Sequence, residues 1–511
     1  MSVAGASTLA APPSVTVPSS TGIDARVVIA GPGARAIAFV LDYLIRLALS
    51  FAYLLIAAWA ILGNLDFDVP TDSETLWSLA GIVPSLAIFF LYHIILEPLM
   101  AGRTPGKRLI GLRIVTPEGT VPSVGALMTR NVFRLFDSLP ALYMIGLSFV
   151  IFGRRHRRVG DLAAGTVLAV DRAPFLEKLG LGTLASKRGA ASPDAAWYEM
   201  RRRAVALSRR RGSDVADALA TVDDYRRVAN ALGKKAEGPG AASAHTVEYL
   251  EAAYADLHDT IHRPARRARL EIWSLLRDRL PAAMHDMRVH LLAVTLLFVI
   301  AAVTGWFLVY TYPDLIGMFA DPGLIATVER GELWTEGMLN VAPSAVYAVS
   351  ILSNNIVVAL FCFTSGVIFG LGAFYSSGLN GIQLGAIYAF TQQHALGGKL
   401  FDFIVAHGCV ELSCICLAGA AGAYIGESLI RPGELTRGES FRRATAQAML
   451  LMVVVTLLLL GCGFIEGYVS PDPEIPRWAR VTIGVGYWLF MVSLLRGYVF
   501  GRSRGGEPVP R

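Results

Sequence analysis

The sequence has few charged residues and lacks the short motifs on which many soluble enzymes depend. Asp, Glu, Lys and Arg make up 17% of its 511 residues, whereas about 25% is usual for soluble domains. No HExxH or CxxC motif is present. GRTPGK at 102–107 resembles a phosphate loop, but it has one spacer residue too few, and Arg108 replaces the Ser or Thr that would bind magnesium. The sequence therefore predicts no catalytic residues and no cofactor, and we expect a protein that is not an enzyme.

Cysteines are few, and a secretory signal is not recognisable. The five cysteines are odd in number and all lie in apolar segments, which predicts buried thiols and not a disulfide framework. Residues 1–20 lack the basic start of a signal peptide and are rich in Ala, Ser, Thr and Pro. This composition predicts a disordered tail over 1–21.

Long apolar runs are abundant, because hydrophobic residues make up 54% of the chain. The first block of runs, 22–171, contains two predicted membrane spans at 34–62 and 76–96. A third run, 138–152, is shorter than a span and is interrupted by a proline and a glycine. Basic sequences flank it on both sides, so we expect a re-entrant hairpin with both ends in the cytoplasm.

A second block of apolar runs, 289–500, contains six predicted spans. These lie at 290–310, 354–375, 381–393, 403–430, 446–464 and 481–498. The predicted fold class is an all-α polytopic membrane protein, with two helical membrane blocks joined by a soluble helical domain. The distribution of Lys and Arg among the loops predicts a cytoplasmic (inner) membrane location, with both termini, including the tail 501–511, in the cytoplasm.

The segment 172–288 is polar and basic, and is predicted to be the helical cytoplasmic domain. Of the 46 Lys and Arg, 21 lie between Asp171 and Arg288. Such clustering beside membrane spans favours attraction to anionic lipid, and no nucleic-acid-binding motif accompanies it. Four helices are predicted here, at 197–211, 213–232, 246–262 and 265–280.

Ionisable residues occur inside the predicted spans, where charge is costly unless it faces protein, water or a partner charge. Arg35, Asp42 and Arg46 are spaced to line one helical face. We expect them to neutralise each other; the alternative is that Asp42 carries a proton or binds a cation. A second face of the same kind comprises Arg130, Arg134 and Asp137.

In the second block, His407, Glu411 and Cys414 are spaced to share one face of a helix. All three are metal-ligand types, but one helix rarely completes a site and the sequence indicates no partner cluster, so we predict no metal. A hydrogen bond between His407 and Glu411, or a pair that shares protons, is the favoured interpretation. The polar residues most able to join this pair are Asn354, Asn355, Gln383, Gln392 and Gln393.

Glycines four residues apart occur three times in the second block, and small residues at this spacing let helix backbones approach closely. The pairs are Gly366 and Gly370, Gly381 and Gly385, and Gly422 and Gly426. We expect them to pack helices within the bundle, and self-association into a homo-oligomer is a further possibility.

The first block resembles the RDD family over about 22–171. The segments that carry the resemblance are GARAIAFVLDYLIR, GRTPGKRLIGLRIVTPEGTVPS, RNVFRLFD and RRHRRVGDLAAGTVLAV. The family is named for one Arg and two Asp; Arg35 and Asp42 match the first two, and Asp161, or alternatively Asp137, matches the third. The resemblance implies a membrane module for which transport has been suggested.

From about 197 to 470 the chain is similar to the stage II sporulation protein M family. The similarity rests on VEYLEAAYADLHDTIHRP, SNNIVVALFCFTSGVIFGLGAFYSSGLNGIQLGAIYAF, AHGCVELSCICLAGAAGAYIG and FIEGYVSP. His407, Gly408 and Glu411 match the family's HGxxE pattern. The similarity implies a membrane scaffold, and related fused chains resemble membrane components found beside MoxR-type ATPases.

We therefore expect an organiser of a cell-envelope complex that contacts membrane lipid and protein partners but not nucleic acid. The alternative is an ion- or proton-coupled transporter, in which Asp42 or the His407–Glu411 pair carries charge.

Overall fold

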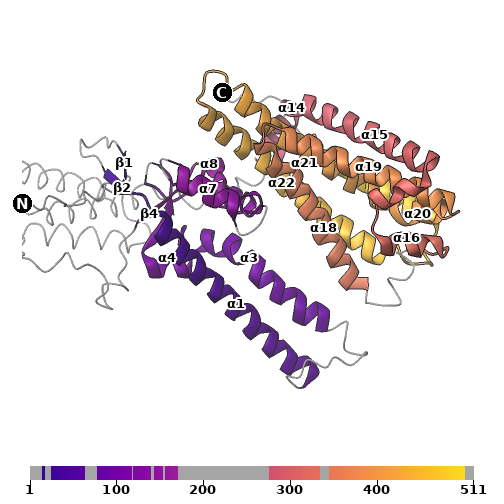
Figure 1. The fold of residues 1–511 in the computed structure, drawn as a ribbon, viewed down its shortest axis with the longest axis horizontal. Helices are drawn as coiled ribbons and strands as arrows, with labels where there is room; N and C mark the ends of the chain where they lie inside the picture. The colour runs from indigo at the N-terminus through magenta and orange to yellow at the C-terminus, as the bar shows by residue number, and fades with distance from the viewer. Residues whose placement is uncertain are drawn as a thin grey trace, which may run out of the picture. The chain divides into compact units, whose positions relative to one another are not determined.

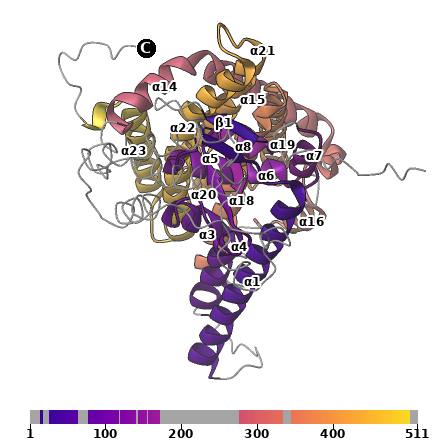
Figure 2. The same cartoon turned by 90° about the vertical axis from the view of Figure 1, so that its left-hand side faces the viewer.

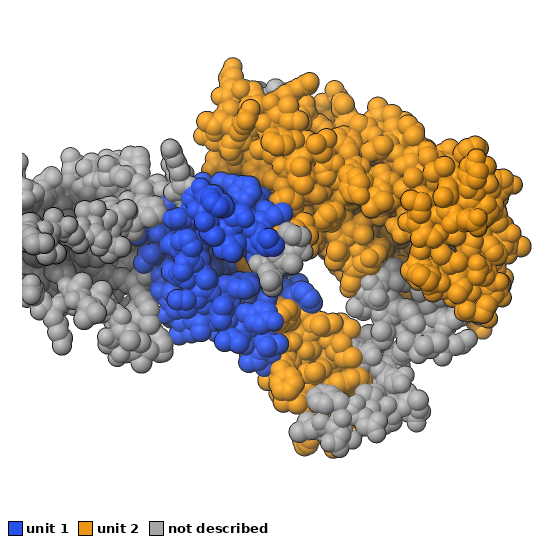
Figure 3. All heavy atoms as spheres, viewed as in Figure 1, with its two compact units in different colours: residues 1–48, 90–128, 143–266 blue, residues 49–89, 129–142, 267–511 orange. Residues whose placement is uncertain are grey.

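The computed structural model is helical, and its described residues form two compact units (Figures 1 and 3). The described residues are 14–17, 25–63, 77–117, 119–139, 143–153, 156–170, 275–333 and 344–500. Unit 1 is drawn from 1–48, 90–128 and 143–266, and unit 2 from 49–89, 129–142 and 267–511. The helices predicted at 197–211, 213–232 and 246–262, most of that at 265–280, and the tail 501–511 lie outside the described residues.

Two long apolar helices begin the fold and run side by side (Figures 1 and 2). Helix α1, Pro32–Leu62, has 31 residues, which gives it a length of roughly 45 Å, more than the hydrocarbon core of a membrane. Helix α3, Val83–Leu99, follows a short π-helical turn, η2, at Trp77–Ile82. The hydroxyls of Ser50 and Ser85 lie 2.8 Å apart between the two helices. These helices match the predicted spans at 34–62 and 76–96.

Two small antiparallel sheets of two strands each add to the helical fold, and the sequence analysis predicted neither. Strand β1, Ser14–Val17, pairs with β2, Ala25–Val28. Strand β3, Leu112–Val115, pairs with β4, Val167–Val170. All four strands are rich in the β-branched residues that favour this conformation. The expectation of a disordered tail over 1–21 is therefore wrong for residues 14–17.

Short helices complete the described part of the first block. Helix α4, Pro105–Ile110, precedes β3, while α5, Val124–Val132, and α6, Arg134–Asp137, follow it. Helix α7, Met144–Phe152, lies within the predicted hairpin, and α8, Val159–Ala164, precedes β4. The nine residues of α7 are about 14 Å long, too short to cross a membrane. Its re-entrant placement stays a prediction.

Unit 2 contains six long helices among its described residues. They are α15 (Arg288–Thr311), α18 (Ser344–Thr364), α19 (Leu371–Gln393), α21 (Gly408–Ile430), α22 (Arg437–Tyr468) and α23 (Arg477–Leu495). The shorter α14 (Leu280–Asp286) precedes them, and α20 (Gly397–Ile404) lies between α19 and α21. The bounds of three predicted spans are wrong. The span predicted at 381–393 covers only the second part of α19. The run 354–375 is broken by a turn at η5, Ser365–Val367, and 403–430 is divided between α20 and α21.

Helix α21 is the buried centre of unit 2, with 14 of its 23 residues buried. The turn between α18 and α19 lies directly on it, because a Cβ added to Gly366 would stand 2.1 Å from the carbonyl oxygen of Gly422. Gly370 has a φ of +82°, which glycine adopts readily, and its backbone lies against Gly426. Two of the glycine pairs noted in the sequence therefore face each other.

The third glycine pair packs α19 on α15. A Cβ on Gly385 would stand 1.8 Å from the carbonyl oxygen of Ala302, and one on Gly381 would stand 2.5 Å from that of Phe298. At one end of these helices, η4 (Pro313–Met318) and α16 (Pro322–Glu329) form a cap. The cap buries Ile316 and Val328 in one apolar cluster with the ends of α15 and α19.

Candidate functional site

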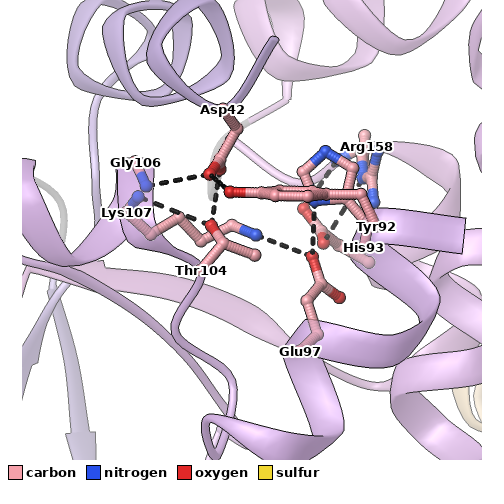
Figure 4. Close-up of polar contacts among 9 residues, drawn as sticks. Asp42, Tyr92, His93, Glu97, Thr104, Gly106, Lys107 and Arg158 are labelled. Atoms are coloured by element: carbon pink, nitrogen blue, oxygen red, sulfur yellow. Dashed lines mark hydrogen bonds and ion pairs between the residues drawn. The ribbon is translucent and has the colours of Figure 1, made fainter. Parts of the chain in front are cut away.

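Unit 1 holds a network of buried ionisable residues centred on Asp42 of α1 (Figure 4). Asp42 is 1% exposed. Its carboxylate accepts a hydrogen bond from the Tyr92 hydroxyl of α3 at 3.0 Å, from the Thr104 hydroxyl at 2.5 Å and from the Gly106 backbone N–H at 2.8 Å. The expected pairing of Asp42 with Arg35 or Arg46 is therefore replaced by three neutral donors from outside α1.

The GRTPGK segment explains how these donors are placed. Thr104 is the N-cap of α4 and Pro105 is its first residue, an arrangement typical of a helix start. The free backbone N–H groups and the dipole of a helix N-terminus attract an anion. Here that anion is the Asp42 carboxylate, which belongs to the protein itself. The loop that resembles a phosphate loop in sequence thus binds a side chain.

Arg35 pairs with the other aspartate of the family pattern. Its Nη1 lies 3.0 Å from Oδ2 of Asp161, which is 0% exposed. The Arg158 backbone N–H also donates to Asp161, at 3.3 Å. Asp161 stands in the first turn of α8, where a negative charge is favourable. The structure thus brings Arg35 to Asp161, one of the two aspartates that the sequence left as alternatives, while Asp137 lies buried in α6.

A second buried ion pair in unit 1 was not predicted. Glu97, near the end of α3, lies 2.6 Å from Nζ of Lys107 in α4, and His93 Nδ1 is 3.9 Å from the same carboxylate (Figure 4). All three side chains are buried. Glu97 directly follows the predicted span 76–96. A carboxylate at the end of a membrane span is a signal that could have identified it. Lys107 was noted only as part of the segment that resembles a phosphate loop.

Breaking the Glu97–Lys107 pair should destabilise unit 1. Glu97→Gln and Lys107→Met should each lower the free energy of unfolding by about 3–5 kcal/mol, because each removes one side of an ion pair in a buried site. The double variant should lose much less than the sum of the two single losses. Unfolding of the purified variants in detergent measures this difference. Strictly additive losses would mean that the two side chains depend on other partners.

Unit 2 gathers three ionisable side chains at the start of α21. His407 is the N-cap of α21, and its Nε2 lies 3.7 Å from Oε2 of Glu411, one turn further along. Glu466, near the end of α22, places Oε1 3.8 Å from the same nitrogen. Ligand atoms of all three lie within 4.8 Å of one another. The sequence predicted the first two as neighbours; it did not predict Glu466, which lies just beyond the predicted span 446–464.

Further polar groups surround this cluster. Nδ1 of His407 lies 3.0 Å from the hydroxyl of Ser470, and the Asn355 side chain hydrogen-bonds Glu411. Of the polar residues expected to join, Asn355 is present in the site, while Asn354 is exposed. The three glutamines lie elsewhere: Gln383 donates to the Phe319 carbonyl, Gln392 accepts from Trp306 and Gln393 donates to the Tyr310 carbonyl.

The remaining predicted residues stand apart from this cluster. Cys414 is buried on α21, yet it is not among the three potential ligand residues that the structure brings together. Arg130, in α5, is buried, whereas Arg134, in α6, is only partly buried.

The described helices and the buried charges define a class. Six helices are long and apolar enough to cross a membrane: Pro32–Leu62, Ala80–Leu99, Arg288–Thr311, Gly408–Ile430, Arg437–Tyr468 and Arg477–Leu495. The protein is a multi-pass helical membrane protein, which confirms the predicted fold class.

Comparison with family models then identifies its parts. The RDD family model matches residues 29–165, and the Stage II sporulation protein M model matches residues 294–471. The chain therefore carries an RDD family domain followed by a Stage II sporulation protein M family domain. Both resemblances noted in the sequence are confirmed, the second one over 294–471 and not over 197–293. No curated protein and no solved structure matches the chain significantly.

Proposed function

We propose that this protein is a membrane organiser, a multi-pass scaffold that holds protein partners of a cell-envelope complex. The observation that carries the proposal is the interior of α21. Residues 414–423 are Cys, Ile, Leu, Ala and Gly only, and all ten are buried. This stretch is about 15 Å long, and it separates the polar cluster at His407 from the other end of the helix. A core of this kind supports a sealed bundle.

Two further features support the same function. The backbones of Gly366 and Gly422, and those of Gly385 and Ala302, are in close contact, so that there is no room for water between the packed segments at these positions. The cap formed by η4 and α16 buries apolar residues at one end of the bundle. A rigid bundle suits a scaffold, because partners need a fixed surface. The fusion resembles chains that accompany MoxR-type ATPases, and we propose such a system as the class of partner.

An ion- or proton-coupled transporter is the second candidate. Its support is the set of buried ionisable side chains, Asp42 in unit 1 and His407, Glu411 and Glu466 in unit 2, because intramembrane ionisable residues often mark ion pathways. The geometry favours a transporter less than a scaffold. Asp42 already accepts hydrogen bonds from three donors of the protein. In unit 2 the buried residues 414–423 of α21, which follow the cluster, are all apolar.

The proposed topology places both termini in the cytoplasm of the inner membrane. In a chain with Cys409→Ser, single cysteines at Arg108, Val170 and Leu435 should react with an impermeant maleimide only after the cells are opened. Cysteines at Asp321 and Glu474 should react in intact cells. All five of these residues are exposed in the structure. Labelling of Val170 from outside would show that the 138–152 segment crosses the membrane.

Purification in mild detergent tests the scaffold function. The wild-type protein and Gly486→Ala, whose added Cβ meets nothing within 4 Å, should bring down the same small set of proteins in fixed ratio. Gly422→Ala, which disturbs the centre of the bundle, should lose that set while its membrane insertion is retained. If the wild-type protein purifies alone after crosslinking in intact cells, the scaffold proposal fails.

A further inference from the structure

We propose that His407, Glu411 and Glu466 form a binding site for one divalent first-row transition-metal ion, with Zn²⁺ as the ion that best fits the ligands. The proposal is independent of the scaffold function, because it rests on the local geometry of α21 and α22. One imidazole and two carboxylates are ordinary Zn²⁺ ligands. From the sequence we predicted no metal, because one helix offered too few ligands. In the structure, Glu466 of α22 supplies a third potential ligand.

The two carboxylates of the cluster favour a bound cation. Two carboxylates lie in the interior of the bundle with ligand atoms no more than 4.8 Å from one another. Two ionised carboxylates at this separation repel strongly in a largely buried site, and a positive charge between them removes this cost. A divalent cation would neutralise both carboxylates at once, which matches the charge of the site.

The distances also suit a shared ion. The separations of 3.7 Å and 3.8 Å between His407 Nε2 and the two carboxylates are longer than a hydrogen bond. Ligands bound to Zn²⁺ at its usual bond lengths in a tetrahedron lie about 3.3–3.6 Å from each other. Small side-chain adjustments would therefore bring His407 and both carboxylates into coordination.

An independent observation points to a ligand at Glu466. This residue is only 7% exposed, and its Oε2 is buried without a hydrogen-bond partner among the described residues. A buried carboxylate oxygen without a donor is costly, and a bound cation would satisfy it. The Glu411 side chain is 18% exposed, which leaves the cluster open to an entering ion.

The surrounding groups are arranged as metal sites require. A metal-binding histidine is oriented by a partner on its second ring nitrogen. Ser470 provides this partner to Nδ1 of His407 and so directs Nε2 towards the carboxylates. The Asn355 side chain lies beside the Glu411 carboxylate. Loss of such an outer partner typically weakens metal binding about 10–100-fold.

Zn²⁺ binding by the untagged full-length protein tests the site. After treatment with EDTA and its removal, the protein should bind one Zn²⁺ per chain in competition with a chromophoric chelator, and its melting temperature in detergent should rise. Glu411→Gln, Glu466→Gln and His407→Ala should each weaken binding at least 100-fold, and Ser470→Ala about 10–100-fold. The control variants His394→Ala and Glu474→Gln change residues outside the cluster and should bind as the wild type does.

Two results would overturn the site. One is a wild-type protein that binds no stoichiometric Zn²⁺ and melts at the same temperature with and without it; a proton shared between the carboxylates would then explain the cluster. The other is Zn²⁺ binding that persists in both glutamine variants. If a variant fails to fold, Zn²⁺ binding and the melting temperature of the EDTA-treated wild-type protein, measured with and without added Zn²⁺, still test the proposal.

Discussion

Replacing Asp42 with Ala is expected to cause one of the largest losses of stability of any single substitution in unit 1. Tyr92, Thr104 and Gly106 would each lose their acceptor inside a buried site. A buried donor left without a partner costs about 1–3 kcal/mol, so the three together should lower the free energy of unfolding by several kcal/mol. Asp42→Asn should lose less, because its amide oxygen can still accept. Thermal unfolding in detergent measures both variants.

The contact between Asp42 and α4 can also be tested by a substitution at Gly106. A Cβ on Gly106 would stand 2.7 Å from Cγ of Asp42 and from the backbone of Ala38, so Gly106→Ala should resemble the Asp42 variants. Gly125→Ala is the control, because its Cβ would meet nothing within 4 Å. If Asp42→Ala and Gly106→Ala both melt like the wild type, Asp42 does not anchor α4, and a role in ion binding becomes the better account.

The second large effect is expected at the centre of unit 2. Gly422→Ala would bring its Cβ within 2.4 Å of the Cys362 carbonyl oxygen, and Gly366→Ala would bring its own within 2.1 Å of the Gly422 carbonyl oxygen. Overpacking typically costs about 1–3 kcal/mol, and we expect the upper end or more, since the obstructing atoms are backbone. Both variants should melt well below the wild type.

Gly486→Ala in α23 is the matched control for this prediction, because it adds the same methyl group where nothing lies within 4 Å. Its melting temperature should equal or slightly exceed that of the wild type. Equal melting of Gly422→Ala and Gly486→Ala would show that α21 is not packed as closely against the 366–370 turn as the structure has it.

Hydropathy and charge were sufficient to predict the fold class and most of the long helices, because apolar length is a direct requirement of a membrane span. They failed at the turn between α18 and α19. This turn lies inside a continuous apolar run, since a turn covered by protein need not be polar. Glycines at 366 and 370 were correctly singled out, but their spacing also fits a continuous helix, so the reversal of the chain could not be predicted.

The candidate sites were predicted only in part, because helical spacing identifies neighbours on one helix but not between helices. His407 and Glu411 were paired in this way. Glu466 was left outside the predicted span 446–464, whereas α22 continues to Tyr468. Asp42 was matched with arginines of its own helix, although its partners lie 50 to 64 residues away in the sequence. Contacts at that separation depend on the tertiary fold.

Ion flux in proteoliposomes tests the scaffold account most directly. Vesicles that contain the purified wild-type protein should conduct protons, K⁺ and Zn²⁺ no faster than protein-free vesicles under an imposed gradient, because the interior of α21 is apolar over residues 414–423. A vesicle sample with an added ionophore confirms that the dyes respond. Flux in the wild type that Asp42→Asn or Glu411→Gln abolishes would contradict the account and establish a transporter.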